Sequence, residues 1–189
     1  NKVVLNNIKA TEIAVDHLVK LGHKKIALIC GNIKESTARY RRDGFLEAMK
    51  KQNLEVDENL IKDGVYYLDA GYSCMEDLIQ NRDEHPFTAV IVSTYGLSCS
   101  AIHAIKDYGL SYPKDFSFIG FDMEDSDRLF SPSITSVLQP GKQIGKLLVH
   151  RLLQSMESFD LAAEKEDYTV TFVDPVIKIG ESTASVKDA

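Results

Sequence analysis

Four short runs of apolar, largely β-branched residues alternate with stretches that have helical periodicity. The runs are KVVLN at 2–6, KIALIC at 25–30, TAVIVS at 88–93 and DFSFIGF at 115–121. Apolar runs without polar alternation are typical of parallel strands that are buried on both faces. The helical stretches between them supply the crossover connections that parallel strands need. The alternation therefore predicts an α/β fold with doubly wound parallel sheets.

The helical stretches have apolar stripes and recognisable ends. In ATEIAVDHLVKLG at 10–22, apolar residues recur on one face and Gly22 ends the helix. Similar stripes occur at 96–110 and at 141–156. We expect these helices to cover the faces of the sheets.

Composition excludes several classes of protein. The chain has 189 residues, of which 44% are hydrophobic and 26% are charged, and its formal net charge is −6. It contains no apolar run of the roughly 20 residues that a membrane helix needs. Its negative charge argues against binding of a nucleic-acid backbone by this chain alone. We expect a soluble protein that does not bind a membrane.

The three cysteines do not indicate a metal site or a disulfide framework. Cys30, Cys74 and Cys99 form no CxxC pair and lie in apolar or helical patterns. We expect buried thiols in a reducing cytoplasm, and no metal or cofactor.

Arg41 is the first candidate binding residue. In a doubly wound fold, ligands bind outside the carboxyl ends of the strands, and a helix that Ser36 could cap follows the strand at 25–30. Thr37 and Arg41 share the stripe of the core-facing Phe45. A partly buried guanidinium needs a partner, which predicts that Arg41 binds a polar ligand in a cleft. A structural ion pair with a neighbouring acid is the alternative.

Asp122 is the second candidate, because it directly follows the strand at 115–121. A carboxylate there can accept hydrogen bonds from ligand hydroxyl or amine groups. The aromatic residues Tyr66, Tyr67 and Tyr95 could contact a sugar or a flat heterocycle, or could be half-buried core residues. The acids at 124–127 lack the spacing of a calcium loop and are expected to form a solvated loop.

Known catalytic motifs are absent from the sequence. It has no GxSxG, GxGxxG, Walker or HExxH pattern, and its five histidines are scattered. A catalytic protein would need a general base in the cleft, for which Asp122 is the obvious candidate. We predict that the protein is not an enzyme.

Several blocks in order resemble the effector-binding domain of LacI/GalR-type bacterial transcription regulators. The blocks are NNIKATEIAVDHLVKLGHKKIALICG, RYRRDGFLEAMKKQNL, DAGYSCMEDLI, TAVIVS, IHAIKDYGLSYPKDFSFIGFD, SPSITSVLQPGKQIGKLLVHRLL and ESTA, spanning about residues 3–184. The resemblance implies a periplasmic-binding-protein-like fold of two subdomains, a ligand cleft between them, a cytoplasmic homodimer, and operator binding through an N-terminal helix-turn-helix that precedes this chain. A periplasmic-type sugar receptor, which shares the fold, is the alternative.

The resemblance also divides the chain. Residues 1–22 and 132–165 correspond to a remnant of the N-terminal subdomain, residues 23–131 and 166–184 to the effector-binding C-terminal subdomain, and 185–189 to a tail. We therefore expect a piece of a longer protein, with apolar helix faces uncovered in the remnants.

The family's ligand contacts map onto seven residues of this sequence: Arg41, Asp122, Thr37, Tyr66, Tyr95, Asn6 and Gln139. One departure matters: Thr94 and Tyr95 replace the asparagine-aspartate pair that is common after the third inner strand. The implied effector is a small molecule, with a sugar or sugar derivative favoured. Dimer contacts correspond to Cys99, Ile102, Lys106, Leu129 and Phe130, and the alternative for Leu129 and Phe130 is packing within one chain.

Overall fold

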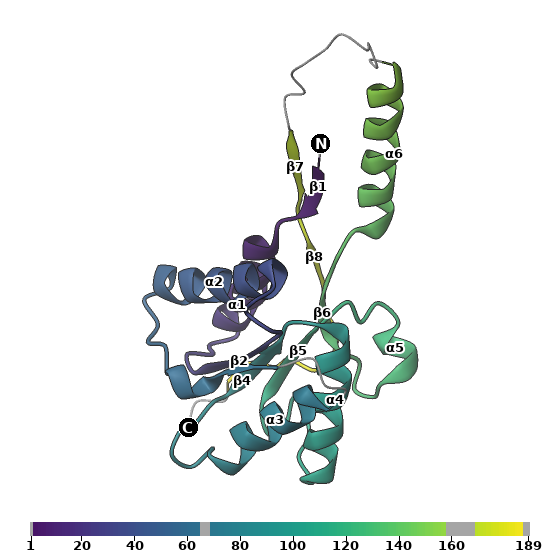
Figure 1. Cartoon of the computed structure of the whole chain (residues 1–189). Coiled ribbons are helices and arrows are strands. Elements are labelled where there is room, and N and C mark those ends of the chain that lie inside the picture. Colours follow the sequence, from purple (N-terminus) through teal and green to yellow (C-terminus); the bar gives the residue numbers. More distant parts are fainter. Residues whose placement is uncertain (1, 65–68, 158–168, 187–189) are drawn as a thin grey trace.

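A six-stranded sheet forms the centre of the molecule in a computed structural model that describes residues 2–64, 69–157 and 169–186 (Figure 1). Its strands are β2 (Ile26–Cys30), β3 (Ile61–Asp63), β4 (Ala89–Val92), β5 (Ser117–Phe121), β6 (Thr135–Leu138) and β8 (Val176–Lys178), in the order β3-β2-β4-β5-β6-β8. All neighbours are parallel except β6 and β8. The predicted α/β fold is confirmed.

Two helix pairs cover the two faces of this sheet. Helices α1 (Asn7–Lys20) and α2 (Ser36–Lys51) bury one face with the apolar cluster around Leu18, Leu28 and Phe45. Helices α3 (Ala70–Gln80) and α4 (Tyr95–Asp107) bury the other face. Strands β2, β4 and β5 are buried at every position, as their continuous apolar runs predict.

The helix starts differ from expectation by a few residues. Helix α1 begins at Asn7 because the side chain of Asn6 accepts a hydrogen bond from Lys9 N at 3.1 Å. Ser36 is the first residue of α2, whose N-cap is Glu35 and has no side-chain capping bond. The predicted Ser36 cap is therefore wrong, and the amides at the start of α2 have no side-chain cap. A 3-10 helix η1 (Glu58–Leu60) leads into β3.

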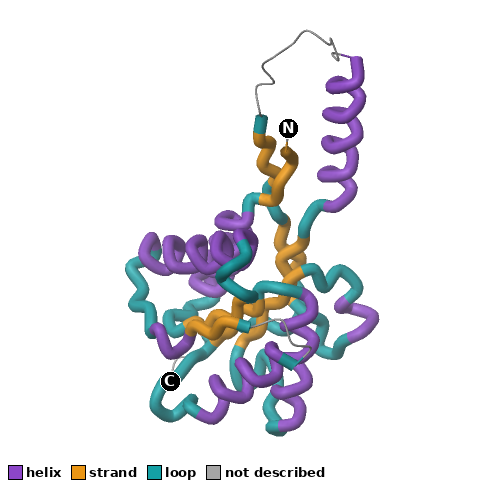
Figure 2. Tube along the Cα trace, in the orientation of Figure 1, coloured by secondary structure: helices purple, strands orange, loops and turns teal. Residues whose placement is uncertain are grey.

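A second, smaller unit extends away from the sheet (Figures 1 and 2). It consists of β1 (Lys2–Leu5) paired in parallel with β7 (Val170–Val173), together with α6 (Gly141–Glu157). Apolar side chains of α6 are exposed, namely Leu148, Val149, Leu152, Leu153 and Met156. This unit therefore has the uncovered apolar surface that the sequence predicts.

Three crossovers connect the two units: residues 5–7 between β1 and α1, 138–141 between β6 and α6, and 173–176 between β7 and β8. The segments that make up each unit differ from the expected division. Helix α1 and strand β6 belong to the six-stranded unit, although 1–22 and 132–165 were expected in the other, and β7 pairs with β1. The reason is apolar burial: Ala10, Ala14 and Leu18 of α1 are fully buried against the sheet.

The loop that follows β5 contains the short helix α5 (Ser126–Leu129) and lies over the edge of the sheet. Lys178 in β8 holds this loop, because its Nζ donates to Glu124 O at 2.6 Å and to Asp127 Oδ1 at 3.1 Å. In the part of the chain that the structure describes, no helix is long and apolar enough to cross a membrane.

Candidate functional site

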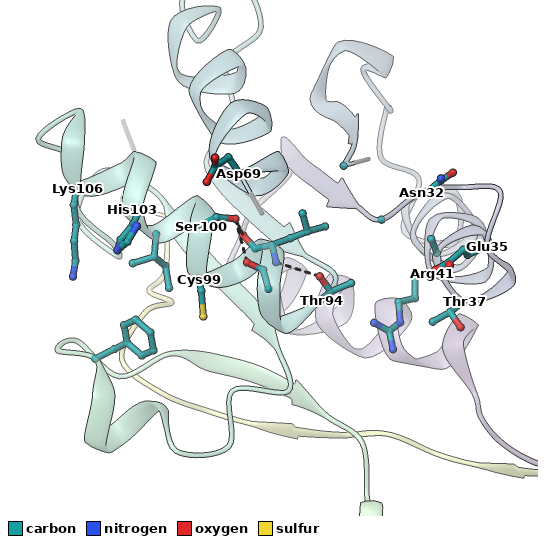
Figure 3. A pocket seen from close by; sticks show the side chains of 17 residues that line it. Asn32, Glu35, Thr37, Arg41, Asp69, Thr94, Cys99, Ser100, His103 and Lys106 are labelled. Atoms are coloured by element: carbon teal, nitrogen blue, oxygen red, sulfur yellow. Dashed lines mark hydrogen bonds between the residues drawn. The ribbon is translucent and has the colours of Figure 1, made fainter. Parts of the chain in front are cut away.

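A cavity of about 720 Å³ lies at the carboxyl ends of β2 and β4. Figure 3 shows Asn32, Glu35, Thr37 and Arg41 on one side of it and His103 and Lys106 on the other, with Thr94 and Ser100 between them. In the first group, Asn32 and Glu35 come from the β2–α2 connection and Thr37 and Arg41 from α2, and the second group comes from α4. The cavity is therefore at the edge of the sheet where doubly wound folds bind ligands.

Arg41 is buried in the wall of this cavity, with 4% of its surface exposed. Its Nε donates to Asn7 Oδ1 at 2.9 Å, and its Nη1 donates to the carbonyl oxygen of Ser93. Its guanidinium carbon lies 4.7 Å from the centre of the Phe121 ring. The side chain is thus held in one orientation by α1, by the end of β4 and by β5.

The partners of Arg41 are electrically neutral. Among the described residues, the ion pairs within 4.0 Å do not include Arg41. Burial lowers the pKa of Arg41, and the negative charge of Asp122 opposes this shift. A desolvated guanidinium without a close carboxylate retains donor capacity and charge that a polar ligand can use.

Asp122 directly follows β5 and has a left-handed backbone, at φ 57°. Aspartate tolerates this region better than most residues, although the conformation is unfavourable for any side chain with a Cβ. Its Oδ1 accepts from Gln139 N at 3.2 Å and its Oδ2 from Gln139 Nε2 at 2.8 Å. The predicted ligand residues Asp122 and Gln139 therefore contact each other, and Gln139 lies on the second crossover.

Asp122 and Tyr95 line a second cavity, of about 280 Å³, beside α5. Tyr95 is exposed at the start of α4, where a hydrogen bond with Cys99 raises the pKa of its hydroxyl. The seven expected ligand residues therefore do not share one cavity. Arg41 and Thr37 line the larger one, and Asp122 and Tyr95 the smaller.

Asn6 and Tyr66 complete the expected set. Asn6 lies on the first crossover, where its Oδ1 caps α1 and its Nδ2 donates to Asp174 Oδ1 at 3.1 Å. Its amide is therefore already bonded within the protein. Tyr66 lies outside the described residues.

Sequence reasoning missed Asn7 and the carbonyl of Ser93, which hold Arg41. Residue types do not indicate which backbone carbonyl will accept a hydrogen bond from a side chain. Asn7 could have been found only as a second polar residue after the apolar run at 2–5.

The residues expected at a dimer contact occupy different environments. Leu129 is 65% exposed and Lys106 is exposed, whereas Cys99 and Phe130 are partly buried. Ile102 is only 1% exposed, because it lies on the face of α4 that packs into the core. A contact of these five positions with a second chain stays a prediction.

Among the described residues, no group of three or more His, Cys, Asp or Glu side chains could hold a metal ion. The three cysteines are free, burial raises the pKa of Cys30, and burial raises the pKa of Cys74 to about 11. The thiol of Cys30 donates to Asp63 Oδ1 at 3.0 Å.

A parallel sheet with a ligand-sized cavity at its carboxyl edge, joined by three crossovers to a second unit, defines a class of two-unit ligand-binding domains. The chain belongs to the family described as the periplasmic binding protein-like domain, which matches residues 15–183. Membership is consistent with the position of the cavity and of Arg41.

Two relatives of the chain are named as transcriptional repressors. The chain is 32% identical over 174 residues to the HTH-type transcriptional repressor PurR of Haemophilus influenzae strain PittEE, covering 92% of this chain and 51% of that protein. It is 28% identical over 187 residues to the ribose operon repressor of H. influenzae strain Rd, covering 99% of this chain and 54% of that protein. The chain thus spans about half the length of these relatives.

A solved structure gives the same result. The chain superimposes with a TM-score of 0.82 on a LacI family transcriptional regulator from Mycobacterium smegmatis, at 28% identity, covering 97% of this chain and 66% of that one. The resemblance to LacI/GalR-type regulators is confirmed.

Proposed function

We propose that the protein is the ligand-sensing part of a LacI/GalR-type transcription regulator and binds a small molecule at the carboxyl edge of its six-stranded sheet. The observation that carries the proposal is the state of Arg41: it is buried in a cavity wall, held by neutral partners and without a close carboxylate. Its remaining donor capacity is suited to a polar ligand.

A sugar or sugar derivative is the ligand class that we propose. Arg41 offers donors in the larger cavity, and Asp122 offers acceptors and the exposed ring of Tyr95 an aromatic face in the smaller one; Phe130 lines both cavities. A polyhydroxylated ligand can use both donors and acceptors. D-ribose is a reasoned first probe, because one relative is named a ribose operon repressor.

The proposed mechanism is a shift between orientations of the two units. A ligand that binds one orientation more tightly shifts the population toward it, by an amount set by the difference in affinity. In the proposed cytoplasmic homodimer, the contact between subunits lies near Cys99, Ile102 and Lys106 and at Leu129 and Phe130. The shift would then change the affinity for operator DNA, which is bound through a helix-turn-helix outside this chain.

The test is a thermal-shift screen of sugars, sugar phosphates and nucleobases. A ligand at a hundredfold excess over its dissociation constant stabilises the folded state by about 2.7 kcal/mol. We expect a hit with wild-type protein that is lost in Arg41→Ala. Arg42→Ala is the matched control, because Arg42 pairs with Glu58 and Asp63 instead of lining the cavity. A shift that survives Arg41→Ala would contradict the proposal.

A further inference from the structure

We infer that Asn7 is a positioning residue for Arg41 and orients its guanidinium for the ligand. Asn7 accepts the Nε–H of Arg41 at 2.9 Å, and Ser93 O accepts from Nη1. Nη2 has no hydrogen-bond partner among the described residues, and Arg41 lines the cavity, so Nη2 and the second hydrogen of Nη1 remain for a ligand. The inference rests on the proposed function, because the orientation of Arg41 matters to a ligand only if this cavity binds one.

The amide of Asn7 is itself held in one orientation. Its Nδ2 donates to Leu5 O at 3.2 Å, on the strand side of the first crossover. Because this bond uses the nitrogen, the oxygen must face Arg41. Arg41 is therefore tied to the end of β1 through one side chain.

Asn7 is not required as a helix cap. Asn6 supplies the side-chain oxygen that accepts from Lys9 N and caps α1. Asn7 is the first residue of the helix, and its side-chain oxygen has Arg41 as its partner. Capping and positioning are therefore performed by adjacent residues that have the same side chain.

The backbone of Arg41 is held by α1, the helix that also carries Asn7. Thr11 is fully buried, and its Oγ1 donates to Arg41 O at 2.8 Å. A Cβ placed on Gly44 would lie 2.4 Å from Ile8 O, so the backbones of α1 and α2 are in close contact here. With its backbone fixed by Thr11, Arg41 has only its side-chain torsions left, and Asn7 restricts those.

Asn7 orients Arg41 without neutralising it. A carboxylate at position 7 could make the same bond but would cancel the positive charge, whereas alanine would keep the charge and lose the bond. Asn7→Asp and Asn7→Ala therefore separate orientation from charge.

The first experiment needs no ligand. We would measure hydrogen exchange of the Arg41 Nε–H by ¹⁵N NMR, assigning the signal by its absence in Arg41→Ala. We expect slow exchange in wild type and in Asn7→Asp, and exchange faster by about tenfold or more in Asn7→Ala, because a hydrogen bond to a charged group is lost. Asn6→Ala, which removes the neighbouring amide, should leave the signal protected. Asn7→Leu replaces Asn7→Ala if the latter does not fold.

Equal protection in wild type and Asn7→Ala would overturn the inference. Loss of protection in Asn6→Ala to the same extent as in Asn7→Ala would also overturn it, since general loosening of α1 would then explain both results.

The second experiment measures D-ribose binding by calorimetry. We expect Asn7→Ala to weaken binding by roughly tenfold, and Asn7→Asp to bind this neutral sugar more tightly than Asn7→Ala. Unchanged affinity in Asn7→Ala would overturn the ligand-directed role of Asn7. Failure of wild type to bind D-ribose would count against the proposed ligand class, and the exchange measurement would then decide on Asn7 alone.

Discussion

The two charged residues of the candidate site have the same kind of support. Arg41 is held by the amide of Asn7 on the first crossover, and Asp122 by the amide and backbone of Gln139 on the second. An amide can offer a donor or an acceptor without adding charge. Both charged groups therefore keep their charge while their orientation is set from segments that join the two units.

His23 predicts a pH dependence of stability at the residue scale. It is 3% exposed, its Nε2 donates to Ala184 O at 3.0 Å, and its Nδ1 contacts Thr88 Oγ1 at 2.9 Å. Burial lowers the pKa of His23 below its ordinary value of 6.5. The unfolded state therefore binds more protons just below that pH, so the stabilisation present above 6.5 is lost as the pH falls toward the lowered pKa.

We expect the melting temperature of the wild type to decrease as the pH falls below about 6.5. The decrease should be smaller in His23→Asn, which lacks the titrating ring, although that variant is less stable at neutral pH. His150→Asn is the control, because His150 is exposed on α6. Parallel curves for wild type and His23→Asn would contradict the prediction.

At the scale of elements, the two helix pairs depend on glycines where their backbones meet. A Cβ on Gly44 of α2 would lie 2.4 Å from Ile8 O in α1. One on Gly71 of α3 would lie 2.3 Å from Leu97 O in α4. In each pair a backbone oxygen occupies the space that a side chain would need. These glycines therefore set how closely the helices cover the sheet.

Gly44→Ala should lower the free energy of unfolding by about 1–3 kcal/mol, because the added methyl group meets backbone atoms that must move. Alanine otherwise favours a helix over glycine by about 1 kcal/mol. Gly145→Ala in α6 is the matched control: its Cβ would meet nothing within 4 Å, so it should be neutral or stabilising. Urea unfolding of both variants measures the difference. A stabilised Gly44→Ala would show that the helices can separate at no cost.

At the scale of the whole molecule, the two units differ in how much apolar surface they bury. The six-stranded unit buries both faces of its sheet, with Leu28, Ile91 and Phe118 fully buried. In the smaller unit, Leu152 is 61% and Phe172 is 65% exposed. Exposed apolar patches of this kind are sites of association.

Leu152→Gln should therefore change the free energy of unfolding by no more than about 0.5 kcal/mol, because the side chain is exposed. Leu28→Ala is the contrast and should cost about 2–5 kcal/mol. Light scattering should show less self-association of Leu152→Gln than of wild type at the same concentration. A large loss of stability in Leu152→Gln would mean that α6 is covered in solution.

Much of the fold could be predicted because it depends on local patterns. The strand at 26–30 was expected at 25–30, and α6 at 141–157 was expected at 141–156. Fully apolar runs and helical stripes determine such elements through burial alone. Among the site residues, Arg41 and Asp122 could be proposed because the carboxyl ends of parallel strands converge.

The sequence by itself determined the fold class, the family resemblance and the edge of the sheet at which the larger cavity lies, because these follow from hydrophobic periodicity and ordered motifs. Only the tertiary structure decided which unit α1 and β6 join and that Ile102 faces the core. It also decided that Arg41 is held by Asn7 and Ser93 O. These features depend on contacts between residues that are distant in the chain, and residue types and spacing do not specify such pairings.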